Sequence, residues 1–467
     1  MLERRKLLTA LPVRRFREPG GDAVASGKLG VRLTLGLILA LVTLLGTACG
    51  SSGSHQATAH LYVSSRGSDR ANCTHTRPCR SITHAVAVAH AGEQIDVGPG
   101  SYPGEVVLTK RLTIKGSHSP VVNAHGHGRG ILIQGARAAG SVVQGLVVEN
   151  ATYEGILALG TTRVTIAHDV VRDNDRGFFV GHPVAENAGY EGILAQGAKR
   201  VFADDVLRAN ARASFVRHFT GECKANGPPP PTQTVDDRAG GCGESVHLAS
   251  TSDSRVVDNL VIDNIGGIYL TDESAPAAHN LIAGNSIRDN LYDCGITLAS
   301  HSRHAATSNG RPRPRAGGVY DNTIRDNVAG HNGVRVPGAG ILVAAAYPGG
   351  AAYGNRVIGN TVNDNGLPGV ALHSHSLHQD LNGNVIRDNV IGRNAVGGSH
   401  GGPGDGDAGI HRTAGILVWS WRIKISRIEV SGNRIGENYY GIWTKNTPRL
   451  RRAANQYRNV LIHLSQH

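Results

Sequence analysis

One short phrase recurs through the second half of the chain and constrains its fold more than any other feature. Each copy has an apolar residue, a second residue that is most often Arg, and then Asp-Asn. The copies are Val261–Asn264, Ile287–Asn290, Ile324–Asn327, Val362–Asn365 and Ile386–Asn389. Each leads to Gly and a short alternating run, and a last such run is Gly441–Thr444. A unit this small cannot bury its apolar face alone, so the repetition predicts stacked neighbours.

The phrase has the chemistry of a coil with sharp corners. Asn tolerates the left-handed backbone conformation of a tight bend, and Gly adopts positive φ without steric cost. Because side chains alternate along a strand, one set is expected to point inward and the residues between them outward. The inward set is Ile268, Leu270, Ile296, Leu298, Ile341, Val343, Val370, Leu372, Ile416 and Val418, and the outward set is Tyr269, Thr297, Leu342, Ala371 and Leu417.

The repeat period favours one architecture over its rivals. Gly155 to Gly177, Gly192 to Ser214 and Ser245 to Gly267 are each 22 residues apart, and later spacings are stretched by loops. This period, without a helical pattern, fits one turn of a parallel β-helix. It fits a leucine-rich repeat less well, because the Leu scaffold is missing, and the bends differ from the calcium-binding nonapeptide.

These repeats resemble those of the right-handed parallel β-helix superfamily, the pectin-lyase-like fold. Similar repeats occur in periplasmic copper-accessory proteins of the nitrous-oxide-reductase system. The resemblance covers roughly Leu61 to Val460 and implies an all-β solenoid, but the fold hosts lyases, hydrolases, epimerases and adhesins and therefore does not define a function. The composition agrees, since 62 of 467 residues are Gly and aromatic residues make up 4%. We expect one long domain.

The first 49 residues are expected to be an export leader. Leu33 to Ala48 is an uncharged, Leu-rich run behind Lys28 and Arg32, shorter than a comfortable membrane span. Leu45 to Cys49 resembles a bacterial lipoprotein cleavage box, although Gly46 stands where that family usually has Leu. The alternatives are lipidation at Cys49 with a membrane anchor at the cell surface, an uncleaved anchor, and ordinary secretion.

The net charge of the exported part limits the kinds of partner that it is expected to bind. Residues 1–48 carry eight Lys/Arg and three Asp/Glu, so their removal lowers the formal net charge from +12 to +7. A modestly basic surface suits an acidic polysaccharide or cell-wall glycan, and solubility explains it equally well. Nucleic acid is not expected, because no basic patch is interleaved with aromatic residues. We expect a monomer.

The cysteine positions fit an oxidising compartment. Near-neighbour pairing predicts one disulfide between Cys73 and Cys79 and a second between Cys223 and Cys242, which leaves Cys294 over once Cys49 is set aside. A zinc site is the rival interpretation, but neither pair has Cys-x-x-Cys spacing.

After the leader, the chain is expected to consist of a linker at 50–60, a cap with the first coils at 61–116, and repeats with loop insertions at 117–460. The strand Leu61–Ser64 and an amphipathic helix at Ser81–Ala91 resemble the N-terminal cap of secreted β-helix lyases. A cap is needed because the first coil otherwise exposes an open core. Four interruptions, 182–189, 218–243, 303–317 and 397–412, are candidate rim loops.

The candidate catalytic and binding residues come directly after each repeat strand. The fourth to sixth residues from each Gly are Thr271–Glu273, Ala299–His301, Ala344–Ala346, His373–His375 and Trp419–Trp421. Neighbouring coils lie about 4.8 Å apart, so these residues are expected to form a ladder along one edge. The repeated Asp of the Asp-Asn bends is assigned mainly to turn structure, since its side chain can bond to nearby backbone.

Three interpretations of this ladder stay open. In the first, Asp272, Glu273, His301 and His375 are catalytic residues acting on a sugar chain, and Trp419, Trp421 and Tyr269 bind it. In the second, His373 and His375, with His301 and a carboxylate, bind zinc or copper. In the third, these are solvated turn residues, and the Trp side chains cover the core near an end. The cofactor is undefined, with a divalent ion (calcium, zinc or copper) as the candidate. The sequence favours an exported β-helix that binds, and as a lyase or hydrolase cleaves, a polysaccharide, with a non-enzymatic surface or metal-binding accessory protein as the alternative.

Overall fold

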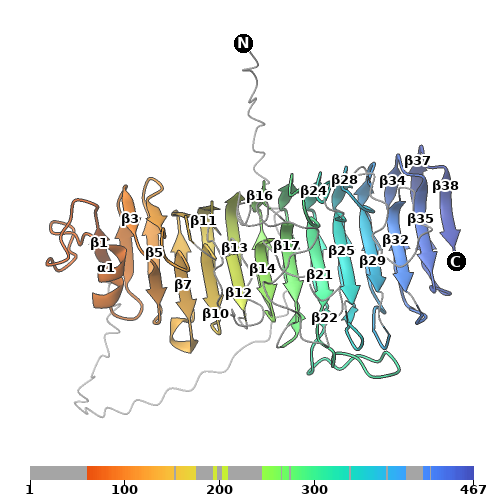
Figure 1. The fold of residues 1–467 in the computed structure, drawn as a ribbon, viewed down its shortest axis with the longest axis horizontal. Coiled ribbons are helices and arrows are strands. Elements are labelled where there is room, and N and C mark those ends of the chain that lie inside the picture. Colours follow the sequence, from red (N-terminus) through yellow and green to blue (C-terminus); the bar gives the residue numbers. More distant parts are fainter. Residues whose placement is uncertain are drawn as a thin grey trace, which may run out of the picture. The chain divides into compact units, whose positions relative to one another are not determined.

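The recurring phrase folds into coils of short parallel strands in a computed structural model of the chain (Figure 1). The structure describes residues 60–151, 154–174, 193–196, 202–208, 244–264, 266–272, 275–335, 338–345, 347–374, 377–395, 414–420 and 422–467. All of them belong to one compact unit, Gln56–His467. No helix in these ranges is long and apolar enough to cross a membrane.

One face of each coil contributes to a 12-stranded parallel sheet. Its strands are β4 (Val106–Leu108), β7 (Ile131–Gln134), β10 (Ile156–Leu159), β12 (Ile193–Gln196), β14 (Glu244–Ala249), β17 (Gly266–Thr271), β21 (Ile296–Ser300), β25 (Ile341–Ala345), β29 (Val370–Ser374), β32 (Ala414–Ser420), β35 (Tyr440–Lys445) and β38 (Ile462–Gln466). Each strand pairs with the equivalent strand of the next coil.

The remaining faces form a 23-stranded sheet, to which most coils contribute two strands. One column contains β1 (His60–Val63), β2 (Gln94–Val97), β5 (Thr113–Gly116), β8 (Val142–Gln144), β11 (Thr165–Arg172), β13 (Phe202–Arg208), β15 (Arg255–Val257), β19 (Leu281–Ala283), β23 (Thr323–Arg325), β27 (Arg356–Ile358), β30 (Val385–Arg387), β33 (Glu429–Ser431) and β36 (Arg451–Ala453). The other contains β3 (Ser101–Pro103), β6 (Val121–Asn123), β9 (Val147–Glu149), β16 (Leu260–Ile262), β20 (Ser286–Arg288), β24 (Val328–Gly330), β28 (Thr361–Asn363), β31 (Val390–Ile391), β34 (Arg434–Gly436) and β37 (Gln456–Arg458), with β11 and β13 joining both. A third, small sheet pairs β18 (Ala277–Ala278), β22 (Val319–Tyr320) and β26 (Ala352–Tyr353).

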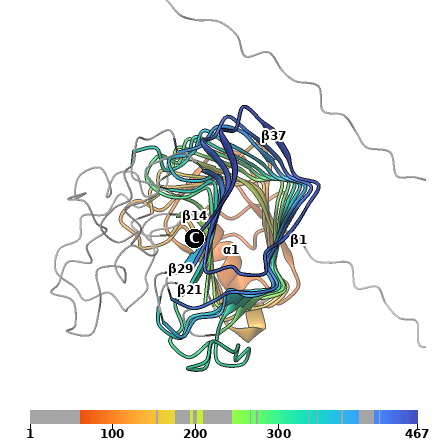
Figure 2. The same cartoon turned by 90° about the vertical axis from the view of Figure 1, so that its right-hand side faces the viewer.

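The core is the space enclosed by the coils, which overlie one another when viewed along the stack (Figure 2). All ten residues predicted to point inward are at most 2% exposed and belong to this one cluster. The predicted all-β, right-handed parallel β-helix is therefore confirmed. The residues predicted to point outward are also largely buried: Tyr269 is 5% exposed and Leu417 is 8% exposed.

The Asp and the Asn of each bend have different roles from those predicted. The Asp adopts the left-handed conformation, with φ of 59° at Asp289 and 56° at Asp326. The Asn that follows is buried and forms a ladder: both the backbone N and Nδ2 of Asn290 donate to Oδ1 of Asn332, at 3.3 and 2.9 Å. Asn327 does the same to Asn360, at 3.0 and 2.9 Å. The assignment of the left-handed residue to Asn was wrong because the ladder needs a buried side chain that both donates and accepts.

Three such Asn ladders run along the coils. They are Asn280–Asn322–Asn355–Asn384, Asn259–Asn285–Asn327–Asn360–Asn389–Asn433–Asn455, and Asn264–Asn290–Asn332–Asn365–Asn394–Asn438. Many Nδ2 groups also donate to a backbone carbonyl, as Asn327 does to Ile282 at 3.0 Å. The ladders thus satisfy buried corner groups where the strand pairing stops.

The first coils contain the one helix of the described ranges, α1 (Ile82–Val88), besides a short 3-10 turn, η1 (Ala136–Ala138). Ser81 Oγ accepts from the His84 N–H at 3.1 Å, so Ser81 caps the helix as Ser does at many N-termini. Ile82, Ala85 and Val86 pack into the common core. The helix was predicted at Ser81–Ala91. Its service as a cap stays a prediction, although Figure 1 shows it at the β1 end of the stack.

Cys73 and Cys79 form the predicted disulfide, and Cys294 is a buried thiol. Burial and the neighbouring Asp293 carboxyl raise the pKa of that thiol far above its ordinary value. The predicted pair Cys223 and Cys242, the lipidation residue Cys49 and three of the four predicted rim loops lie outside the described residues.

Candidate functional site

A cluster of His and Tyr side chains lies on the outer face of the 12-stranded sheet. It comprises His247 on β14, Tyr269 on β17, and His301 and Tyr347, which follow β21 and β25; we call it the Tyr269 cluster. The Tyr269 hydroxyl lies 3.1 Å from His301 Nε2. The Tyr269 ring centroid is 5.0 Å from that of His247, and the His301 centroid is 5.4 Å from that of Tyr347. The cluster thus joins four coils.

Strand register explains why these residues meet. His247 and Tyr269 are direct partners in the β14–β17 ladder, so both side chains leave the sheet on the same face. His301 comes directly after β21, whose Ala299 pairs with Thr271, and its ring reaches back over Tyr269. Phenol and imidazole are both side chains that can act as a general acid or base, and their hydrogen bond provides a path for a proton between them.

His247 was missed by the sequence argument, although a signal existed. Ser245 lies 22 residues before Gly267 in the repeat, and counting two residues further along both coils pairs His247 with Tyr269. In the structure His247 is 5% exposed and its Nε2 lies 2.8 Å from Thr271 Oγ1. This contact fixes the plane of the imidazole beside the Tyr269 ring.

Asp272 has a different environment from the exposed ladder that was expected. Its side chain is buried, and its Oδ1 accepts from the backbone N–H of His301 at 2.6 Å and of Ser302 at 3.1 Å. Its Oδ2 accepts from Ser300 Oγ at 2.9 Å and from the Gly318 N–H. Burial raises the pKa of this carboxyl, against the lowering effect of these N–H donors. The carboxylate therefore holds the backbone that carries His301.

The other predicted site residues are not gathered around this cluster. His373 and Trp419 are partners in the β29–β32 ladder, with ring centroids 5.9 Å apart. Trp419 is 2% exposed and packs with Trp443, Leu417 and Cys294 on the outer face, so its ring offers little surface to a sugar. Glu273, His375 and Trp421 lie outside the described residues, and their roles stay predictions.

The fit of a metal can be tested at His373. Its partners on the neighbouring strands are Ala344 and Trp419, which supply no ligand atom. Across the described ranges, the one group of three ligand-type side chains in close reach is Cys73, Cys79 and His84. Its two sulfurs form a disulfide and so offer no thiolate. Among the described residues nothing beside His373 completes a copper or zinc centre, and its predicted partner His375 lies outside them, so no chemistry is assigned to a metal.

A separate hollow lies on the 23-stranded sheet, across β28, β31, β34 and β37. It has a volume of about 790 Å³ and is lined by Gly392, Gly436, Arg434, Arg458 and the ion pair of Arg393 with Asp364. None of the predicted site residues lines it, so it is not the site that the sequence suggested.

Comparisons with known proteins support the fold over the whole repeat region. Residues 104–311 match the family model described as a right handed beta helix region, and residues 232–463 match the one described as a periplasmic copper-binding protein (NosD). No curated protein matches the sequence. The A-module of the Azotobacter vinelandii mannuronan C-5 epimerase AlgE4 is similar, with a TM-score of 0.54, 14% identity, and coverage of 82% of this chain and 91% of that one. For the AlgE6 A-module from the same organism, the TM-score is 0.53 and the identity 14%, over 82% and 89%. Identities this low show the fold alone.

Proposed function

Because this chain folds as a right-handed parallel β-helix, we propose that it is an exported protein that binds a polysaccharide along the outer face of its 12-stranded sheet. In this proposal the Tyr269 cluster is the centre of the site, and the Tyr269 and His301 side chains form an acid–base pair for cleaving the chain. The observation that carries the proposal is the 3.1 Å hydrogen bond between the Tyr269 hydroxyl and His301 Nε2.

The geometry gives each residue a distinct task. His301 is half-exposed and can exchange a proton with a bound sugar. The Tyr269 hydroxyl can then accept a proton from His301 Nε2 or donate one to it. His247 holds the other side of the Tyr269 ring. Asp272 is a positioning residue, since its carboxylate is occupied by four donors and grips the His301 backbone. The extended, repetitive face suits a polymer because successive coils present similar surfaces at a fixed interval.

Export and the known relatives add support. AlgE4 and AlgE6 are mannuronan C-5 epimerases, which act on a polysaccharide, and NosD is a periplasmic copper-binding protein. The disulfide between Cys73 and Cys79 is also common in exported proteins. Anchoring through a lipid at Cys49 remains part of the proposal.

The first experiment separates chemistry from binding. The protein is incubated with a panel of polysaccharides, and unsaturated products are followed by absorbance and new reducing ends by a colour assay. Tyr269→Phe and His301→Gln are each expected to lower the rate by about 100-fold or more, as expected when a positioned acid or base is lost. Tyr457→Phe, which changes a tyrosine of β37 stacked on His463, is the matched control.

Retention of full activity by Tyr269→Phe would remove this pair from the chemistry. The NosD match favours a second candidate, a metal-binding accessory protein. Absence of any product, together with zinc or copper that is lost in a His373→Ala/His375→Ala variant, would establish that alternative instead.

A further inference from the structure

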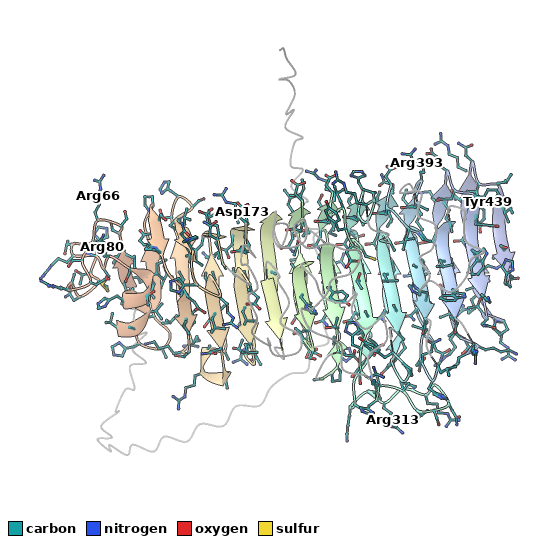
Figure 3. All side chains as sticks on the ribbon, viewed as in Figure 1. Arg66, Arg80, Asp173, Arg313, Arg393 and Tyr439 are labelled. Carbon is teal, nitrogen blue, oxygen red and sulfur yellow. A yellow bond between two sulfur atoms is a disulfide. The ribbon has the colours of Figure 1, made fainter. Side chains whose placement is uncertain are left out.

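The loop 301–318, which joins β21 to β22, carries a concentrated positive charge. Its 18 residues include four arginines and two histidines and no acidic residue. Arg311, Arg313 and Arg315 are all exposed, and none forms an ion pair with an acid among the described residues. Figure 3 shows Arg313 on the loop that projects beyond the strands at this edge of the stack. Some other exposed arginines of the repeats differ, because they pair with the Asp of their own bend, as Arg288 does with Asp289 and Arg325 with Asp326.

A single buried carboxylate closes the base of this loop. Asp272 accepts from His301 N and Ser302 N where the loop starts and from Gly318 N where it ends. Ser302 Oγ adds a bond to the Ala316 carbonyl at 3.1 Å. The two ends are therefore held together, and the loop is built on a fixed base.

The loop interior is also ordered by its own contacts. Arg313 N donates to the Ala305 carbonyl at 2.6 Å, and Thr307 N donates to the Arg311 carbonyl at 2.8 Å. Ala305 and Ala306 are buried against Ala351. Pro312 and Pro314 alternate with the arginines; each proline ring fixes the proline's own φ angle and restricts the arginine before it to extended conformations. Less conformational entropy is lost when such pre-ordered arginines bind a partner.

The loop is physically connected to the Tyr269 cluster. The Arg303 guanidinium carbon lies 4.9 Å from the centre of the Tyr347 ring, and that ring contacts His301. His301 belongs to both structures, since it starts the loop and bonds to Tyr269. A polymer lying over the cluster would therefore pass beside Arg303, near the start of the loop.

We propose that the loop 301–318 selects an acidic glycan, one with a repeating carboxylate, for the site around Tyr269. This inference rests on the proposed function. Guanidinium groups bind carboxylates through paired, charge-assisted hydrogen bonds, which neutral sugars cannot reproduce. A nucleic acid fits less well because the loop has no Phe, Tyr or Trp on which a base could stack. A lipid surface fits less well because its apolar residues, Ala305 and Ala306, are buried.

The test compares polymers that differ only in charge. Polygalacturonate, alginate and hyaluronan are immobilised as free acids and as methyl esters, and binding is measured at low and high salt. The wild type is expected to bind at least one free acid about tenfold more tightly than its ester, with the preference shrinking as salt screens the charges. Arg311→Gln/Arg313→Gln/Arg315→Gln should lose that preference, and both proteins should bind the esters alike.

The control variant is Arg356→Gln/Arg434→Gln/Arg458→Gln, which removes the same charge from exposed positions of the 23-stranded sheet and should keep the preference. Equal binding of acid and ester by the wild type, or equal losses in the two triple variants, would overturn the inference while leaving the proposed function standing. Failure of every acidic and neutral polymer to bind would instead overturn the proposed function. Binding of the wild type to phosphatidylglycerol vesicles but to no glycan would identify the loop as a lipid-binding element.

Discussion

At the residue scale, Asp and Asn of the repeated bend are not interchangeable. Asp takes the left-handed conformation at the surface and pairs with a neighbouring arginine, as Asp289 does with Arg288 at 2.9 Å. Asn is buried and both donates and accepts, so that each ladder joins one coil to the next. An Asp in the ladder would lose the Nδ2 donor and bury a charge.

The Asn ladder gives a direct prediction for Asn327→Ala. The change leaves the Asn285 N–H and Nδ2 without their acceptor, and a buried unpaired polar group costs about 1–3 kcal/mol. We expect the free energy of unfolding in urea to fall by about 3 kcal/mol. Asp326→Asn next to it is the control and should change the stability by less than about 1 kcal/mol, because Asn tolerates the left-handed conformation. Equal effects of the two substitutions would contradict the ladder's role.

A second residue-scale prediction concerns Glu154, whose side chain is 3% exposed. Burial raises the pKa of this carboxyl, and Arg129 Nε, 3.2 Å from Oε2, only partly opposes the shift. The folded protein therefore holds this proton to a higher pH than the unfolded chain, in which Glu titrates near about 4.3. Stability should thus decrease as the pH rises through this window, and Glu154→Gln should flatten that decrease in a series of urea titrations. An unchanged pH profile would show that Glu154 is not the group responsible.

At the element scale, the strand register determines the positions of the side chains on the outer face of the 12-stranded sheet. The turns and loops after the strands determine which further side chains contact them. Tyr269 and His247 meet because β14 and β17 are in register. His301 joins them only because Asp272 holds the turn after β21. One buried acid thus serves both the proposed site and the basic loop.

Asp272→Asn should loosen this arrangement. The new amide carries N–H groups at the position of Oδ2, which now accepts from Ser300 Oγ and from the Gly318 N–H. These two hydrogen bonds are therefore lost, and the end of the loop is no longer held. Limited proteolysis with trypsin should then cut after Arg303 and Arg315 several-fold faster, whereas the bonds after Arg311 and Arg313 precede proline and should resist. Asp326→Asn, on the opposite sheet, should leave the rate unchanged. Faster cutting in that control as well would point to general unfolding.

At the scale of the whole molecule, each coil is stabilised by the coils on either side. The last coil, which contains β36, β37 and β38, has a described neighbour on one side only, and all three residues of β36 are exposed. Local opening should therefore require less free energy there than in the middle of the stack.

Hydrogen exchange can measure this gradient. Backbone amides of β36 and β37 should exchange faster than those of β23 and β27, which are hydrogen-bonded between coils on both sides. Uniform protection along the whole stack would indicate that the unit opens all at once, contrary to a nearest-neighbour solenoid.

The amino-acid sequence by itself determined the coil, its inward residues and the disulfide between Cys73 and Cys79, because period and alternation are local properties that appear in one dimension. It predicted Tyr269 and His301 as site residues but ascribed an exposed catalytic role to Asp272, which the fold buries under four donors. The repeat register aligned His247 with Tyr269 in the sequence, but where the residues beyond the strands lie depends on the turns and loops, which no local pattern encodes. Only the tertiary structure could bring His301 to Tyr269 and show that Asn, not Asp, links the corners inside the stack.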